Sequence, residues 1–249
     1  VFSLAFGSAA GVASDAAAPW LLPLALATLL TGGFGVLASR NARRLIAYSV
    51  IVSIGTLLAG IGLGNPPGLS AALVYLVHTT LITAGMFLLA DLIAMQRGHG
   101  DSRPAPPVAQ PLILGALFFV GAVAMAGMPP LSGFLGKALL LRAAEETSAL
   151  PWLWSVVLGS GLLLMVALSR MGSSLFWNTL DAPTPGISAQ VRLLLPVVAL
   201  LAAGPLLMVL ARPLTHFAAE TARQILAPAA YIETVLANRS LAPAAGTTP

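Results

Sequence analysis

The sequence predicts an all-α fold, a polytopic transmembrane helix bundle in which one helix is discontinuous. Hydrophobic residues make up 58% of the 249 residues and charged residues only 8%, against about 25% in ordinary soluble domains. Six apolar runs are long enough to cross a bilayer. One of them contains a stretch rich in glycine and proline, followed by the only lysine, Lys137. A charge and helix breakers within one apolar run indicate an ion or proton site on a broken helix.

The spans follow one another along most of the chain. An arginine-rich segment separates the first from the second, and the uncharged turn 65–68 separates the second from the third. As one straight helix the fourth run would be about 45 Å long, more than a bilayer requires, so we expect either a break at 127–133 or a strong tilt. The predicted spans are 20–38, 45–63, 69–93, 112–141, 152–168 and 193–210.

The two ends of the chain differ from this pattern. Segment 1–6 is apolar but too short to span, and we interpret it as the end of a helix, with the chain as the C-terminal part of a longer subunit. Residues 1–212 are predicted to form the transmembrane domain. Residues 213–249 are predicted to form a tail, with a short amphipathic helix near 231–236 and a partly disordered end.

Basic residues predict the orientation. Because cytoplasmic loops carry an excess of arginine and lysine, we place the side with seven arginines in the cytoplasm and the side of Arg142 and Arg212 outside. This distribution also explains the net charge of +4, so nucleic acid is not an expected partner. The seven arginines are Arg40, Arg43, Arg44, Arg97, Arg103, Arg170 and Arg192.

Lys137 is the first candidate for chemistry. A charged side chain inside a bilayer costs about 3 kcal/mol on insertion scales. A lysine in such a site can load and release a proton, and the broken helix beside it would supply free carbonyls and a helix end. The alternative is a lysine near the membrane edge that extends to the headgroups. We favour the first interpretation because a snorkelling lysine would not need the break.

His78 is the second candidate. It lies in the middle third of its span, beside a ridge in which Tyr75, Thr79 and Thr83 recur every four residues. Hydroxyl groups next to an imidazole can hold water and pass protons, with Ser132 at the break as a further lining residue. The alternative is a neutral histidine that packs by a hydrogen bond to a neighbouring helix.

Other polar residues have less specific interpretations. Asp91, about three and a half turns beyond His78, is either a gate at the cytoplasmic side or, as we favour, an interfacial carboxylate. A stripe of Ser49, Ser53, Thr56 and Gly60 is typical of tight helix packing, with a water path as the second interpretation. No cysteine is present and the three histidines are widely spaced, so we expect no metal site and no cofactor.

Three segments resemble a known family of membrane proteins. The segment 43–55, the histidine-bearing segment 78–91 and the broken segment 127–137 are similar to the antiporter-like subunits shared by respiratory complex I and the multisubunit Mrp (Pha or Mnh) cation/proton antiporters. Segments 84–93 and 131–137 most resemble the D-type branch of the Mrp group. The resemblance covers roughly residues 20–145 and is weak beyond residue 150.

The resemblance implies a fold of about fourteen helices, of which this chain would hold the second half. It also implies exchange of Na⁺ or K⁺ for H⁺ in a bacterial inner (plasma) membrane, within a complex of several different subunits. Lys137 would carry the proton, His78 would relay it, and Tyr75, Thr79, Thr83 and Ser132 would line the path. Many relatives have a lysine at the position of Thr83, so a relay here would pass through water or His78.

Two rival functions remain open at this point. The chain could be a proton-pumping membrane subunit of an NADH–quinone oxidoreductase of the complex I type. It could also be a structural subunit that retains only a vestigial path. Neighbouring subunits would distinguish the first rival, and unchanged transport after loss of Lys137 would indicate the second.

Overall fold

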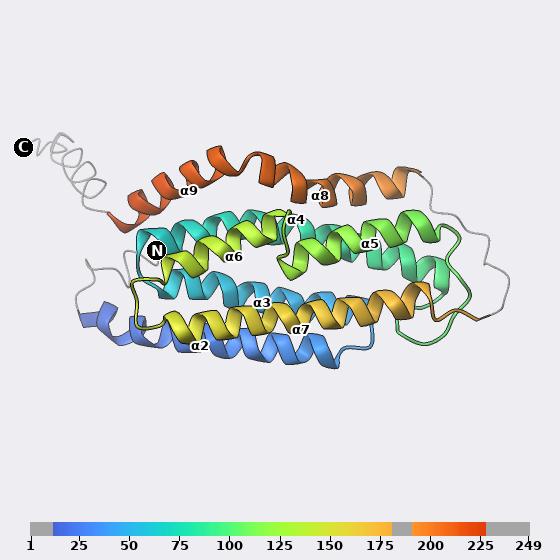
Figure 1. Ribbon diagram of the computed structural model, residues 1–249, viewed down its shortest axis with the longest axis horizontal. Coiled ribbons are helices and arrows are strands. Elements are labelled where there is room, and N and C mark those ends of the chain that lie inside the picture. Colours follow the sequence, from blue (N-terminus) through green and yellow to red (C-terminus); the bar gives the residue numbers. More distant parts are fainter. Residues whose placement is uncertain (1–11, 181–190, 228–249) are drawn as a thin grey trace, which may run out of the picture.

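The computed structural model describes residues 12–180 and 191–227, with side chains from residue 18 onward, and regular structure in these ranges is helical. The helices form an elongated bundle with their axes roughly aligned (Figure 1). The predicted all-α bundle is therefore confirmed. The helices are α2 (Val12–Ala38), α3 (Ala42–Gly62), α4 (Pro66–Arg97), α5 (Pro111–Ala126), α6 (Ser132–Ala143), α7 (Leu150–Phe176), α8 (Val191–Val209) and α9 (Ala211–Leu226).

The predicted spans correspond to these helices. Five helices of the described ranges are long and apolar enough to cross a membrane, namely α2 from Ala18 onward, α3, α4, α7 and α8. The fourth predicted span, 112–141, is divided into α5 with 16 residues and α6 with 12. The predicted discontinuous helix is thus present, and its break lies within the predicted segment 127–133.

Helix α4 is the central element of the bundle and packs against α3, α5, α6, α8 and α9. It begins at Pro66 because the Asn65 side chain accepts a hydrogen bond from the Gly68 amide (2.8 Å) and prolines fit the first turn, where no amide donor is needed. Its 32 residues continue past the predicted span to Arg97, and Gly98 ends it with φ of +80°.

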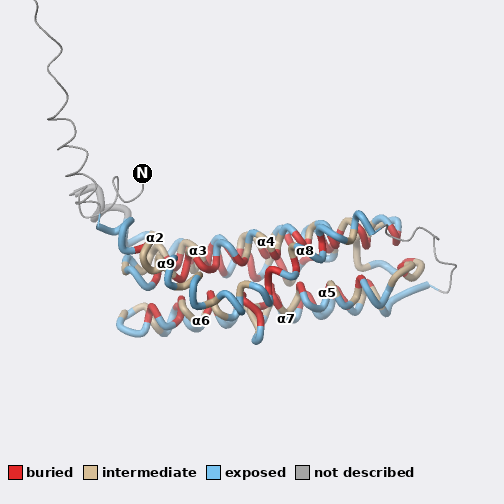
Figure 2. The backbone as a smooth tube through the Cα atoms, turned by 90° about the horizontal axis from the view of Figure 1, so that it is seen from above, coloured by how far each residue is buried: buried red, intermediate tan, exposed pale blue. Residues whose placement is uncertain are grey.

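Burial follows the faces of the helices (Figure 2). Inward residues such as Leu29, Ile82 and Leu114 are fully buried, whereas Phe34 and Leu112 are 62% and 84% exposed. Extensive exposed apolar surface of this kind is typical of a protein that meets lipid. The chain is therefore a multi-pass membrane protein.

Arginines gather at one end of the bundle. The Arg170 guanidinium donates hydrogen bonds to the carbonyls of Leu37 and Ser39 at the end of α2, and the Ser102 amide donates to the Arg40 carbonyl (2.8 Å). At the opposite end, Arg142 and Arg212 line one cavity. The grouping agrees with the sequence pattern, while the assignment of this end to the cytoplasm stays a prediction.

Arg97 fastens helices together at the arginine-rich end. Its side chain is buried, with Nη1 donating to the Leu175 carbonyl (2.5 Å) and Nη2 to the Arg103 carbonyl (2.8 Å). The last turn of α4 is thus joined to the last turn of α7 and to the loop that follows α4.

Helix α9 is an element that sequence analysis did not anticipate. Helix α8 ends at Val209, and Pro213, four residues later, has no amide hydrogen to donate to the Val209 carbonyl. Helix α9 then starts at Ala211 and packs against α4. The predicted boundary between residues 212 and 213 lies in its first turn, and the division into domain and tail stays a prediction. The predicted segments 1–6 and 231–236 lie outside the described residues.

Candidate functional site at the broken helix

The break between α5 and α6 is produced by glycine and proline in succession. Gly127 adopts φ of +77°, and the Gly127 and Met128 amides donate to the carbonyls of Ala124 (3.2 Å) and Val123 (3.1 Å), which is a Schellman ending. Pro129 and Pro130 follow and have no amide hydrogen. In a continuous helix, residue 130 would donate to the carbonyl of residue 126. The Ala126 carbonyl therefore has no backbone donor from that position.

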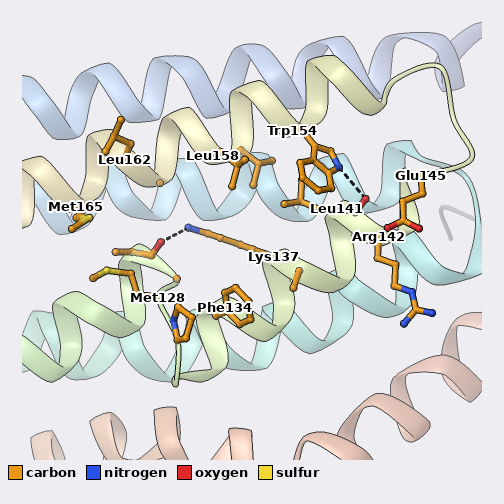
Figure 3. A pocket seen from close by; sticks show the side chains of 16 residues that line it. Met128, Phe134, Lys137, Leu141, Arg142, Glu145, Trp154, Leu158, Leu162 and Met165 are labelled. Carbon is orange, nitrogen blue, oxygen red and sulfur yellow. Dashed lines mark hydrogen bonds between the residues drawn. The ribbon is translucent and has the colours of Figure 1, made fainter.

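Lys137 supplies the missing donor. Its Nζ donates a hydrogen bond to the Ala126 carbonyl (2.9 Å), and the residue is 7% exposed. The side chain extends along α6 toward the break and away from Arg142 (Figure 3). A lysine that extended to the headgroups at the end of α6 would point the other way, so this conformation is not the snorkelling one.

Helix α7 gives the depth of the lysine amine. A Cβ atom added at Gly161 would lie 3.6 Å from Lys137 Nζ, so the amine is level with that residue. Gly161 lies about 14 Å along α7 from Trp152 and about 24 Å from Trp177. Both tryptophans are exposed, and such residues mark the two membrane interfaces. The amine therefore lies inside the span, nearer the end that carries Arg142.

His78 joins α4 to both halves of the broken helix. Its Nδ1 lies 2.8 Å from the Ser132 hydroxyl in the first turn of α6, and its ring lies close to the Ala124 carbonyl near the end of α5. A Cβ atom at Gly133 would lie 2.2 Å from the Ala124 oxygen and 2.8 Å from His78 Nε2, so only glycine leaves room for this arrangement. His78 is buried and close enough to Lys137 for their charges to interact.

The hydroxyl ridge forms a cluster with α3. The Thr79 hydroxyl donates to Ser53 Oγ (2.7 Å), and the Tyr75 hydroxyl lies 3.4 Å from the same atom. A polar cavity of about 10 Å³ lies among Thr79, Thr83, His78 and Ser53, close to the space that one water molecule requires. The sequence pattern favours a packing role for Ser53, and the structure places Ser53 at the centre of this hydroxyl cluster.

The cavity that Lys137 lines is mainly apolar. A cavity of about 530 Å³ lies between the break, α6 and α7, with Phe134, Leu158, Leu162 and Met165 on its walls (Figure 3). Lys137 thus lines this hydrophobic cavity, whereas His78 lines the small cavity beside the hydroxyl cluster.

Asp91 does not belong to this cluster. It pairs with Arg43 near the start of α3, and both side chains are about half exposed. The 13 residues between His78 and Asp91 correspond to about 20 Å along α4. The structure thus brings together Lys137, His78, Ser132, Tyr75, Thr79 and Thr83, and leaves Asp91 apart.

One partner in the cluster was missed by sequence analysis, namely the Ala126 carbonyl. The signal was available, because a proline identifies the carbonyl four residues earlier as the one without a donor. Within the described residues, no group of three or more histidine, cysteine or acidic side chains could hold a metal ion.

Comparison with known proteins gives consistent matches. The sequence profile of a family described as NADH:quinone oxidoreductase/Mrp antiporter, transmembrane, matches residues 2–165. The D subunit of a probable K⁺/H⁺ antiporter of Rhizobium meliloti is 36% identical over 98% of this chain and 50% of its own length. The D subunit of a Na⁺/H⁺ antiporter of Bacillus subtilis is 30% identical over 86% of this chain and 43% of its own length. The chain thus spans about half the length of these relatives.

A solved structure of an Mrp complex from Dietzia sp. matches with a TM-score of 0.77 at 22% identity, and the match covers 88% of this chain and 49% of the other chain. At that identity the likeness shows the fold alone. The N subunit of an NADH-quinone oxidoreductase of Mycobacterium bovis is 30% identical over 69% of this chain and 33% of its own length.

Proposed function

The chain belongs to the NADH:quinone oxidoreductase/Mrp antiporter family, and we propose that it forms part of a subunit of a multisubunit antiporter that exchanges Na⁺ or K⁺ for H⁺. Its partners would be the other antiporter subunits, and its location the inner membrane of a bacterium. In this proposal the chain is part of a secondary transporter and carries no enzyme activity of its own. The two relatives named as D subunits of antiporters, with 36% and 30% identity, support this assignment.

The observation that carries the proposal is the buried hydrogen bond between Lys137 Nζ and the Ala126 carbonyl. Burial takes water away from a protonated amine, so its charge depends on the few groups that remain around it. The Ala126 carbonyl accepts from the amine in either protonation state. Lys137 can therefore gain and lose a proton without leaving the carbonyl unpaired.

His78 is proposed as the relay toward Lys137. Its ring contacts the Ser132 hydroxyl, the Ala124 carbonyl and the small polar cavity. A histidine can donate through one nitrogen and accept through the other, so a proton can enter on one side of the ring and leave on the other. Tyr75, Thr79, Thr83 and Ser132 would hold water along this path.

Coupling to the cation would be electrostatic. Two positive charges at His78 and Lys137 repel one another in a medium of low dielectric constant, so a proton arriving at one favours release from the other. Passage of a cation nearby has the same effect. Asp91, paired with Arg43, would act as a gate at the arginine-rich end.

The second candidate function is that of a proton-pumping membrane subunit of an NADH–quinone oxidoreductase. The 30% identity to an oxidoreductase N subunit over 69% of this chain favours it. Purification of the native complex distinguishes the two functions, since an antiporter would carry other antiporter subunits and an oxidoreductase would carry redox subunits.

Transport in inverted membrane vesicles tests the proposal. The full complex is compared with and without Lys137→Ala while a fluorescent dye follows a pH gradient formed by respiration. We expect Na⁺ or K⁺ to collapse the gradient in the wild type and not in the variant. An equal response from both would leave Lys137 with a structural role, and no response from the wild type would favour the oxidoreductase function.

A further inference from the structure

A second polar cavity lies at the arginine-rich end, remote from the broken helix. It has a volume of about 410 Å³ and is formed by the end of α2, the segment after α4 and the last third of α7. Its polar lining consists of two guanidinium groups and three hydroxyl groups, from Arg40, Arg170, Ser39, Ser102 and Ser174. We propose that this cavity binds the phosphate group of an anionic phospholipid.

The charges in this cavity are suited to an anion. In the described part of the chain, Arg43, Arg103 and Arg223 each pair with a carboxylate, whereas no carboxylate lies within ion-pair distance of Arg40 or Arg170. Arg170 uses Nη2 for the carbonyls of Leu37 and Ser39, which fixes its position and leaves further guanidinium donors. Guanidinium groups and hydroxyls are the side chains that bind phosphate oxygens well.

The surfaces beside the cavity indicate a lipid as the source of the phosphate. On α2, exposed Leu30 and Phe34 lie on the same face as Leu37, which lines the cavity, and on α7 exposed Leu162 and Val166 precede Arg170 at intervals of four residues. A Cβ atom at Gly33 of α2 would lie 3.2 Å from the Leu163 side chain of α7. Helices α2 and α7 are therefore in contact between their two exposed apolar faces. The polar cavity therefore opens onto apolar surface that acyl chains can cover.

The position of the cavity also fits a headgroup. Trp177, 79% exposed at the end of α7, marks the membrane interface at this end. If this end is cytoplasmic, as the arginines predict, it faces the leaflet in which anionic lipids attract basic pockets between helices. The larger cavity at the opposite end, of about 970 Å³, contains Glu145 and Glu146 beside its arginines. Because these carboxylates repel an anion, this cavity does not share the preference for a phosphate group.

The test uses the full subunit in its native complex, purified in a neutral detergent and titrated with phosphatidylglycerol, with bound lipid counted by native mass spectrometry. Arg40→Gln is the main variant, because the Arg40 side chain makes no described hydrogen bond and its loss should not disturb folding. Arg44→Gln is the matched control, since Arg44 is exposed at the same end and does not line the cavity. Arg170→Lys keeps the charge but removes the planar fork.

We expect the wild type and Arg44→Gln to bind one more phosphatidylglycerol than Arg40→Gln at the same lipid concentration. Loss of one charge-assisted hydrogen bond should weaken this site roughly tenfold, and Arg170→Lys should weaken it as well. Equal binding by Arg40→Gln and Arg44→Gln would overturn the proposal. So would displacement of the lipid by millimolar inorganic phosphate, which would identify a site for a free anion. Binding is read without ion transport, so the result does not depend on the proposed function.

Discussion

The α5–α6 break and the α8–α9 break each have a proline four residues after the end of the first helix, and they differ in what surrounds the gap. At the α5–α6 break, Pro130 leaves the Ala126 carbonyl without its backbone donor, and Lys137 fills the place from within the bundle. At the α8–α9 break, Pro213 does the same to the Val209 carbonyl, but Val209 is 80% exposed. Proline interrupts a helix in both places, but within the described residues only the first break has its freed carbonyl paired with a buried side chain, which makes it the candidate site.

The largest difference between the two breaks is expected in ion transport, when the charged residue at each break is replaced by an uncharged one. Lys137→Met should reduce cation-driven proton movement in inverted vesicles to the level of vesicles without the subunit, because no other described amine reaches the Ala126 carbonyl. Arg212→Gln, at the start of α9 and exposed, should leave the exchange rate within about twofold of the wild type. Equal losses from the two variants would contradict the distinction between the breaks.

Alanine substitutions of glycines near the two breaks should differ in their effect on the stability of the protein. Gly133→Ala would bring a methyl group to 2.2 Å from the Ala124 oxygen, so helices must shift, at a cost of about 2–3 kcal/mol in the free energy of unfolding. Gly204→Ala in α8 meets atoms no nearer than 3.5 Å and should be neutral. Thermal unfolding of the purified complex in detergent measures both, and an unchanged midpoint for Gly133→Ala would refute the packing at the His78 contact.

Replacing the prolines by alanine restores the backbone amide donors, and this should affect transport only at the α5–α6 break. In the double variant Pro129→Ala with Pro130→Ala, residue 130 can donate to the Ala126 carbonyl and compete with Lys137. We expect transport to fall about tenfold while the midpoint of thermal unfolding changes little, since neither proline lies inside a helix. Pro213→Ala should leave transport unchanged. Vesicle transport and thermal unfolding, measured on the same preparations, separate the two effects.

The contact between α4 and α6 should have a smaller effect. Ser132→Ala removes the hydroxyl at 2.8 Å from His78 Nδ1 and should lower the free energy of unfolding by about 1–2 kcal/mol, because the histidine is buried. Ser155→Ala is the control, as its hydroxyl is exposed and bonds only within α7. If Ser155→Ala lowers the free energy of unfolding as much as Ser132→Ala does, the contact between His78 and Ser132 contributes nothing specific to stability.

The smallest effect is expected at the ion pair between Asp91 and Arg43. Both side chains are about half exposed, so Asp91→Asn should change the free energy of unfolding by less than about 1 kcal/mol. A larger loss of transport than of stability would support the proposed gate. Equal and small changes in both would leave Asp91 as a surface residue.

Local signals accounted for most of the fold. Hydropathy located the spans, and Gly127 with the two prolines located the break, because these residues act on the backbone at their own positions. Lys137 and His78 were found as rare polar residues in apolar runs. Helix α9 was missed because its apolar residues occupy only one face, and a search for long apolar runs does not detect such a helix.

Contacts between distant segments could not be predicted in the same way. The distances between Ser53 and Thr79, and between His78 and Ser132, depend on how α3, α4 and α6 pack, and no local pattern encodes them. The hydrogen bond between Lys137 and Ala126 could be predicted in part. Helix geometry identifies the Ala126 carbonyl as the one without a backbone donor, but it does not identify the side chain that reaches it.

The buried Arg97 has a mechanical consequence for the bundle. It pins α4 to α7 at one end, and 19 residues separate it from His78, a lever arm of about 28 Å. A tilt of only about 2° at the pinned end would move the His78 ring by about 1 Å. Such a hinge could make or break the contact with Ser132 while the arginine-rich end stays still.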